Sequence, residues 1–261
     1  MGEEIADGWP EDAGAEEVSL EESESPPWFR LKAAFVHLYT ASGTVLALLI
    51  LVAAYNGEAV KALWLMLAAL LIDSTDGLLA RRFRVSEALP FFDGARLDDI
   101  VDYITYTFAP MVLLWSGGYL PEGMYGLALA ALPLLASSYQ FCRVDAKTDD
   151  HFFLGFPSYF NVVVFYAIVF DPGVSVVSAV ILACSILVFV PIRYVYPTRT
   201  VAFRNLSLLL TTLWLASYAV ILLQMPEPEP LVLGFSILYL FYYFGLSLYL
   251  SFKTLPGRRT K

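Results

Sequence analysis

Cysteine is scarce in this sequence, and its two cysteines do not suggest a site. Cys142 and Cys184 lie within or at the end of apolar segments and lack the spacing of metal ligands. We interpret both as small apolar side chains packed within a membrane. An excess of basic residues is also missing, because 16 basic residues stand against 25 acidic ones. The composition therefore gives no support to nucleic-acid binding.

Basic residues are entirely absent from residues 1–26, which contain ten acidic residues. This segment is rich in Glu, Ser, Gly and Pro and cannot bury enough apolar surface to fold, so we predict a disordered tail. It also lacks the basic start, apolar core and cleavage site of a signal peptide. The remaining chain, residues 27–261, is nearly balanced in charge and is expected to form one membrane-embedded catalytic domain.

Apolar residues, in contrast, make up 58% of the chain, whereas soluble domains contain about 45–50%. The excess falls in runs of roughly 20 residues, the length that a helix needs to span a bilayer. We therefore predict an all-α integral membrane protein with about eight transmembrane helices. Their expected ranges are 33–55, 60–82, 94–117, 124–144, 156–171, 173–194, 203–224 and 230–252.

Most of the basic residues lie in one set of loops. They follow the second, fourth and sixth predicted helices and the last one, whereas the opposite loops contain only Lys61. Short loops rich in Lys and Arg stay in the cytoplasm. An even number of helices then places both termini and the basic loops on the cytoplasmic side.

Four carboxylates lie where two of the predicted helices meet this basic side. Asp73 and Asp76 are three residues apart near the end of the second helix, and Asp98 and Asp102 are four apart at the start of the third. Helical periodicity puts each pair on one face. The connection is short, so the helices should be antiparallel neighbours whose polar faces meet. Acidic side chains near membrane depth are candidates for function.

The residues around these carboxylates suggest what they bind. Four converging carboxylates repel one another and need cations, and oxygen ligands select Mg²⁺, Mn²⁺ or Ca²⁺ rather than zinc. Gly77, Ala80 and Gly94 are small and leave room for a ligand, while Arg81 can make a bidentate contact with phosphate. Carboxylates, cations and an arginine together are the parts of a pyrophosphate site.

The order of these residues resembles the signature of CDP-alcohol phosphatidyltransferases. It reads Asp73-x2-Asp76-Gly77-x2-Ala80-Arg81, then Gly94-x3-Asp98-x3-Asp102. Twelve residues separate Arg81 from Gly94, a longer gap than in most of the family. This gap and the segments 37–43 and 141–159 are similar to the branch of bacterial phosphatidylcholine synthases. The resemblance covers most of residues 30–255.

The resemblance implies an activity and roles for particular residues. CDP-diacylglycerol and free choline would be condensed in a bacterial inner membrane, with the active site in the cytoplasm and the enzyme a homodimer. Two divalent cations, Mn²⁺ or Mg²⁺, would be held by Asp73, Asp76, Asp98 and Asp102. Asp102 would also be the general base. The activated lipid would be bound by Asp76, Gly77, Ala80, Arg81, Gly94, His37 and Thr40.

The acceptor site is indicated by the chemistry of choline. Its quaternary ammonium cannot donate an N–H hydrogen bond, so aromatic faces are its natural partners. The candidates in the cytoplasmic half are Tyr39, Tyr103, Tyr106, Tyr139, His151 and Tyr159. The acidic run of Asp145, Asp149 and Asp150 either adds negative potential near the cation or is an ordinary solvated loop.

Three alternatives stay open at this point. The acceptor could be serine, inositol or glycerol 3-phosphate, or the chemistry could be reversed, with CDP-choline and diacylglycerol as substrates. A cation transporter is the alternative from another class, because intramembrane carboxylates also mark ion pathways. Against it, the acids cluster at one end of the helices and no inverted repeat is evident.

Overall fold

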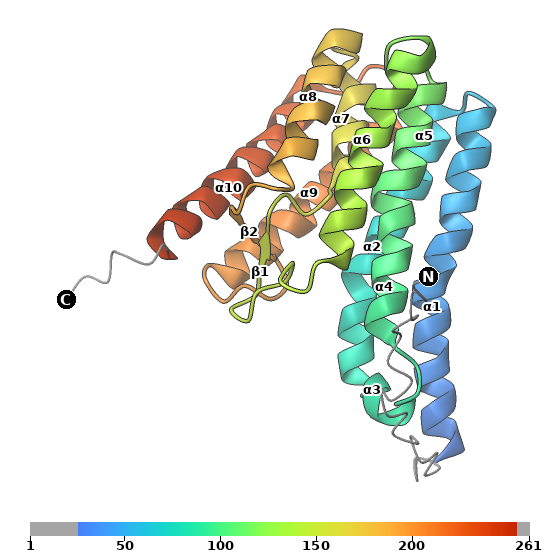
Figure 1. The fold of residues 1–261 in the computed structure, drawn as a ribbon, viewed down its shortest axis with the longest axis vertical. Coiled ribbons are helices and arrows are strands. Elements are labelled where there is room, and N and C mark those ends of the chain that lie inside the picture. Colours follow the sequence, from blue (N-terminus) through green and yellow to red (C-terminus); the bar gives the residue numbers. More distant parts are fainter. Residues whose placement is uncertain (1–25, 255–261) are drawn as a thin grey trace, which may run out of the picture.

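The computed structural model describes residues 26–254, so the predicted disordered tail, apart from its last residue, lies outside the described residues. The described chain is almost entirely helical (Figure 1). Its helices are α1 (Pro27–Tyr55), α2 (Ala59–Arg82), α3 (Val85–Ala88), α4 (Gly94–Asp102), the π-helical η1 (Tyr103–Phe108), α5 (Ala109–Ser116), α6 (Gly123–Cys142), α7 (Phe160–Phe170), α8 (Val174–Leu187), α9 (Arg204–Gln224) and α10 (Pro230–Thr254). Two short strands, β1 (Phe152–Leu154) and β2 (Arg193–Val195), complete the fold.

The predicted all-α membrane architecture is confirmed, with a correction to two helices. The segments α4, η1 and α5 follow one another directly and form the expected third helix. Five helices, α1, α2, α6, α9 and α10, are long and apolar enough to cross a membrane. However, α7 and α8 have only 11 and 14 residues. The sixth predicted helix ends early because the chain leaves the helix after Leu187 to form β2, so the protein is multi-pass but two of its apolar helices are short.

Small residues bring the helices of the first half together. The buried residues of α1 include Ala33, Gly43, Ala47 and Ala53, which let a neighbouring helix approach closely. A Cβ atom at Gly43 would lie 2.5 Å from Cγ1 of Val101 in α4. The close approach of α1 to α2 and α4 fixes the two helices that carry the predicted carboxylates.

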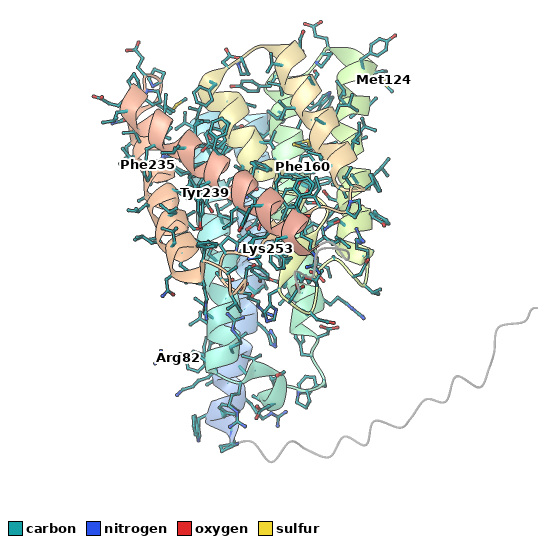
Figure 2. All side chains as sticks on the ribbon, turned by 90° about the vertical axis from the view of Figure 1, so that its left-hand side faces the viewer. Arg82, Met124, Phe160, Phe235, Tyr239 and Lys253 are labelled. Atoms are coloured by element: carbon teal, nitrogen blue, oxygen red, sulfur yellow. The ribbon has the colours of Figure 1, made fainter. Side chains whose placement is uncertain are left out.

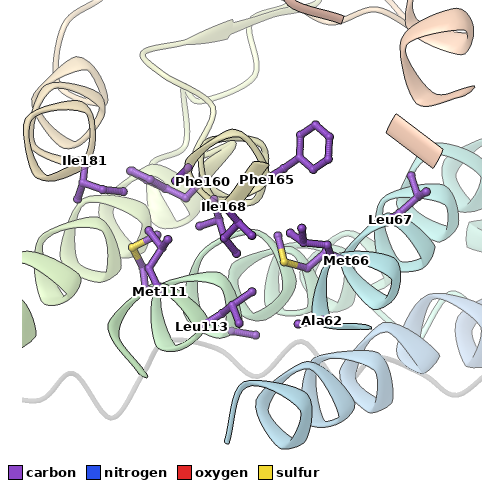
Figure 3. Close-up of a cluster of buried hydrophobic side chains, with 14 of the residues drawn as sticks. Ala62, Met66, Leu67, Met111, Leu113, Phe160, Phe165, Ile168 and Ile181 are labelled. Atoms are coloured by element: carbon purple, nitrogen blue, oxygen red, sulfur yellow. The ribbon is translucent and has the colours of Figure 1, made fainter. Parts of the chain in front are cut away.

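The apolar core surrounds α7. Figure 3 shows Phe160, Phe165 and Ile168 of this helix packed among Met66 of α2 and Met111 of α5. All five side chains are buried. A helix that is apolar on every side belongs in the interior of a bundle, and this position fixes Tyr159, the residue immediately before α7.

The two strands tie together the loops that flank the site. β1 and β2 are antiparallel, with Phe152 opposite Val195 and Leu154 opposite Arg193. Figure 2 shows α10 crossing the bundle at an angle and α2 extending past the level of Lys253 toward Arg82. The pairing therefore joins the loops 143–159 and 188–203, and Figure 1 shows the two strands at about the height of α4.

Candidate active site

The structure brings three of the predicted carboxylates together. One carboxylate oxygen from each of Asp73, Asp98 and Asp102 lies within 4.8 Å of the other two. Asp73 comes from α2 and the other two from α4. The start of α4 is fixed by Asp93, whose side chain accepts a hydrogen bond from the backbone N–H of Arg96 at 3.0 Å. This cap sets the register that turns Asp98 and Asp102 toward α2.

Asp76 stands beside this cluster and has a partner of its own. Asp76 is only 6% exposed, and its Oδ2 accepts a hydrogen bond from the Thr40 hydroxyl of α1 at 2.9 Å. Asp76 does not belong to the group of three within 4.8 Å. Thr40 thus orients one carboxylate of the signature and connects α1 to α2.

Tyr106 connects the cluster to the π-helical segment. Its hydroxyl donates a hydrogen bond to Oδ2 of Asp73 at 2.5 Å, and its ring is buried. The wider helical turn of η1 begins directly after Asp102. Such turns within α-helices occur frequently at functional sites.

The cluster carries more negative charge than its protein partners neutralise. Among the described residues, Lys147 is the only basic side chain in an ion pair with it, with Nζ 3.3 Å from Asp99 and 3.9 Å from Asp98. Burial opposes the charged form of Lys147, but the carboxylates of Asp99 and Asp98 raise its pKa above the ordinary value. A single ammonium against several carboxylates leaves a site whose oxygen donors and charge fit divalent cations.

A cavity of about 1220 Å³ opens beside the cluster. Ligand pockets for small molecules measure about 300–1,000 Å³, so this one has room for more than a small molecule. It is lined by residues of α1, α2, α4, α7, α8, α9 and α10. Its lining includes Asp73, Asp98 and every residue predicted to bind the activated lipid, namely His37, Thr40, Asp76, Gly77, Ala80, Arg81 and Gly94. Asp102 belongs to the carboxylate cluster but does not itself line the cavity.

His37 and Gly94 fit each other closely at the edge of this cavity. A Cβ atom at Gly94 would lie 2.7 Å from Cε1 of His37, and the His37 ring also lies 4.3 Å from the ring of Phe92. The Nε2 atom of His37 is buried and has no hydrogen-bond partner among the described residues. Because buried polar atoms are almost always hydrogen-bonded, this atom is a candidate contact for a ligand in the cavity that His37 lines.

Gly77 leaves space for the arginine of the signature. A Cβ atom there would meet only the end of the Arg81 side chain, at 3.3 Å from Nη1. The guanidinium therefore lies along the surface of α2 beside the carboxylates.

The predicted acceptor residues divide into two groups. Tyr106 and Tyr159 line the cavity, with their ring centroids 5.8 Å apart. The structure places Tyr39, Tyr103, Tyr139 and His151 outside the cavity lining.

Each of the four residues outside the cavity has a local role. The Tyr39 hydroxyl lies 2.8 Å from Oγ1 of Thr75, and Tyr103 donates to the carbonyl of Leu134 at 3.4 Å. The ring of Tyr139 is half exposed and packs 5.0 Å from that of Phe189. His151 is exposed in the loop before β1, where its carbonyl accepts from the hydroxyl of Thr200.

The acidic run after α6 is also used locally. Asp145 pairs with Arg143 at 2.7 Å, and Asp150 pairs with Arg193 at the start of β2 at 2.9 Å. These pairs hold the loop to itself and to β2. None of the three acids in the run lines the cavity.

The cavity lining also contains residues that the sequence pattern did not indicate as site residues, among them Lys147, Tyr196 and Tyr243. Lys147 looked like one of several loop cations, since positive loops are common on the cytoplasmic side of membrane proteins. Tyr243 lies inside an apolar helix, where periodicity does not separate a cavity residue from a packing one. Only the three-dimensional arrangement identifies it.

Comparisons with known proteins agree with this geometry. The profile of the family described as CDP-alcohol phosphatidyltransferase matches residues 37–191. The phosphatidylcholine synthase of Legionella pneumophila is 39% identical over 225 residues, covering 84% of this chain and 88% of that protein. The phosphatidylcholine synthase of Pseudomonas aeruginosa is 37% identical over 227 residues, covering 86% and 94%. That of Mesorhizobium japonicum is 41% identical over 197 residues, covering 76% and 73%.

Proposed function

The chain belongs to the CDP-alcohol phosphatidyltransferase family, and from this premise we propose that it transfers the phosphatidyl group of CDP-diacylglycerol to choline and releases CMP. One observation carries the proposal: Asp73, Asp98 and Asp102 converge beside a cavity that all the other signature residues line. The acceptor is suggested by the relatives, which are phosphatidylcholine synthases and match most of this chain.

Enzymes of this family generally depend on divalent cations, and the donor set fits them. Asp73, Asp98 and Asp102 would hold the cations, with Asp76 beside them; Mn²⁺ and Mg²⁺ are the candidates that oxygen ligands favour. Bound cations would offset the charge of the pyrophosphate and of the departing CMP.

The neighbouring side chains would bind and orient the activated lipid. Arg81 would donate hydrogen bonds to phosphate oxygens, and the unpaired Nε2 of His37 would make a further polar contact with them. Gly77 and Gly94 would let the pyrophosphate approach the helix backbones. Thr40 would keep the carboxylate of Asp76 pointing into the cavity.

The reaction needs a group that takes the proton of the choline hydroxyl. As this oxygen attacks the phosphorus bonded to diacylglycerol, the bond to the CMP oxygen breaks, and the hydroxyl proton moves to a carboxylate. Asp102 would be that base by family resemblance, while Asp98 is the carboxylate of α4 that lines the cavity. Asp102→Asn and Asp98→Asn separate them: the base variant should stop turnover while leaving Mn²⁺-dependent binding of CDP-diacylglycerol partly intact.

The placement of the enzyme follows from its charge pattern. The site lies at the end of the bundle that carries the basic loops, so we place it and both termini in the cytoplasm of a bacterial inner membrane. Residues 27–261 would act as one catalytic domain behind a disordered acidic tail, and the enzyme would be a homodimer. Crosslinking in native membranes tests the dimer, and protease access in oriented vesicles tests the topology.

The activity is tested with purified protein, CDP-diacylglycerol, Mn²⁺ and one labelled alcohol at a time. We expect equal amounts of CMP and phosphatidylcholine with choline and none with serine or inositol. Turnover of glycerol 3-phosphate instead would be consistent with Lys147 and Arg199 in the cavity lining and would overturn the choline assignment. Product from CDP-choline and diacylglycerol would reverse the chemistry, and no CMP with any acceptor would favour a cation transporter.

A further inference from the structure

Three tyrosines form a continuous aromatic wall beside the carboxylates. Tyr106, Tyr159 and Tyr243 all line the cavity and come from η1, the residue before α7, and α10. The ring centroids of Tyr106 and Tyr159 are 5.8 Å apart, and those of Tyr159 and Tyr243 are 6.2 Å apart. The wall begins at the metal-binding cluster, because the Tyr106 hydroxyl is hydrogen-bonded to Asp73.

No cation of the described chain lies over these three rings, although four basic side chains line the cavity. Lys147 pairs with Asp99 and Asp98, and Arg84 pairs with Glu87. Tyr196 differs from the wall in this respect, because the guanidinium of Arg199 already lies 5.5 Å from its ring centroid. The wall therefore offers aromatic faces, next to a carboxylate, to a cation from outside.

Tyr243 is held in place by β2 and not by the signature helices. It is 6% exposed, and its hydroxyl donates to the carbonyl of Val195 at 3.1 Å. The backbone N–H of Val195 donates to the hydroxyl of Ser247, also of α10, at 3.1 Å. Both backbone groups of Val195 are thus bonded to α10, which fixes the ring of Tyr243 toward Tyr159.

The position of Tyr243 in the chain is informative as well. It lies outside residues 37–191, which match the general family profile, whereas Tyr106 and Tyr159 lie inside. The match to the Legionella pneumophila phosphatidylcholine synthase covers 225 residues and so extends beyond this segment. The shared signature thus supplies one end of the cavity, and the C-terminal helix adds a side chain to the other.

We propose that Tyr106, Tyr159 and Tyr243 form the subsite for the quaternary ammonium of the acceptor, with Tyr243 of α10 as its specificity-determining residue. The inference rests on the proposed function. A trimethylammonium group offers no hydrogen-bond donor and binds over aromatic faces. Because the wall begins at the carboxylate cluster, an ammonium group bound at Tyr159 directs the hydroxyl of the same short molecule toward that cluster.

The test compares Tyr243→Leu, which removes the aromatic face, with Tyr243→Phe, which keeps it but loses the bond to Val195. The matched control is Tyr249→Leu, because Tyr249 is on the same helix, is 56% exposed and does not line the cavity. We expect Tyr243→Leu to raise the KM for choline by about 2- to 30-fold and Tyr243→Phe to change it little. The KM for CDP-diacylglycerol should not change. Equal losses in Tyr243→Leu and Tyr243→Phe would mean that Tyr243 only packs against its neighbours. A rise in the KM for both choline and CDP-diacylglycerol would mean the same.

A binding measurement keeps the subsite testable without turnover. Tetramethylammonium, which lacks the hydroxyl, should raise the melting temperature of the Mn²⁺-loaded wild-type protein and of Tyr249→Leu, but not of Tyr243→Leu. If the protein makes phosphatidylcholine but shows no such shift, the subsite is wrong and the function stands. If it shows the shift but uses another acceptor, the function fails and the subsite stands.

Discussion

The two ends of the cavity are built in different ways. At one end, α2 and α4 present carboxylates whose spacing follows the helical repeat, and Thr40 and His37 of α1 border them. At the other end, aromatic side chains come from a π-helical turn, a residue before α7 and the last helix. The first end depends on local sequence, and the second depends on how distant segments pack. The signature carboxylates and the aromatic side chains therefore depend on different kinds of sequence information.

The largest effect is expected at the first end. Asp98→Asn removes one of the proposed cation ligands and should lower the rate of CMP release by about 10³-fold or more, since a bound cation contributes several kcal/mol to the transition state. The rate is measured over a series of Mn²⁺ concentrations. Asp149→Asn is the control, because Asp149 is exposed and outside the cavity. A variant that regains the full rate would show that Asp98 is dispensable.

A smaller effect is expected where two helices approach each other. Gly94→Ala places a Cβ atom 2.7 Å from Cε1 of His37, and displacement of the reacting groups by about 1 Å can cost about 10²-fold in rate. We expect a 10- to 100-fold loss for Gly94→Ala and less for Gly77→Ala, whose Cβ meets only the mobile end of Arg81.

The double variant His37→Ala with Gly94→Ala isolates the steric part of this loss. It should be less impaired than the product of the two single losses, because the alanine at position 37 removes the ring that the new methyl group would meet. If the loss in the double variant equals the product of the two single losses, the contact between His37 and Gly94 has no importance for activity.

The fold and the site also show how much could be predicted from the sequence. The signature spacing placed Asp73 on one helix and Asp98 on its neighbour, and the long apolar helices were found because bilayer thickness sets their length. The sequence did not reveal that α8 stops at Leu187, because pairing of β1 with β2 depends on residues about 40 positions apart. The sequence also could not separate Tyr159 from Tyr139, because both are aromatic residues near the basic side. Only the packing of distant segments places Tyr159 in the cavity lining.

A moderate effect is expected at the hydrogen bond between α1 and α2. Thr40→Val keeps the shape of the side chain but removes the donor to Asp76. A hydrogen bond to a charged group contributes about 1.5–3 kcal/mol, so the KM for CDP-diacylglycerol should rise by about tenfold or more. Thr40→Ser retains the hydroxyl and should stay near the wild type. Similar values for the Val and Ser variants would refute a role for this bond.

The smallest effect is expected for the pair that joins the acidic loop to β2, far from the chemistry. Although slight burial works in the opposite direction, the hydroxyl of Thr148 and the guanidinium of Arg193 lower the pKa of Asp150. A carboxyl whose pKa is lowered in the folded state stabilises the fold above its unfolded pKa of about 4, and this contribution disappears as the pH falls through the folded value. Asp150→Asn should therefore lower the free energy of unfolding by at most about 1 kcal/mol at pH 7, as for other exposed pairs. The difference from the wild type in melting temperature should therefore shrink as the pH falls below about 4, while the KM for choline stays unchanged. A KM that rises in this variant but not in Asp149→Asn would show that the acidic loop takes part in acceptor binding.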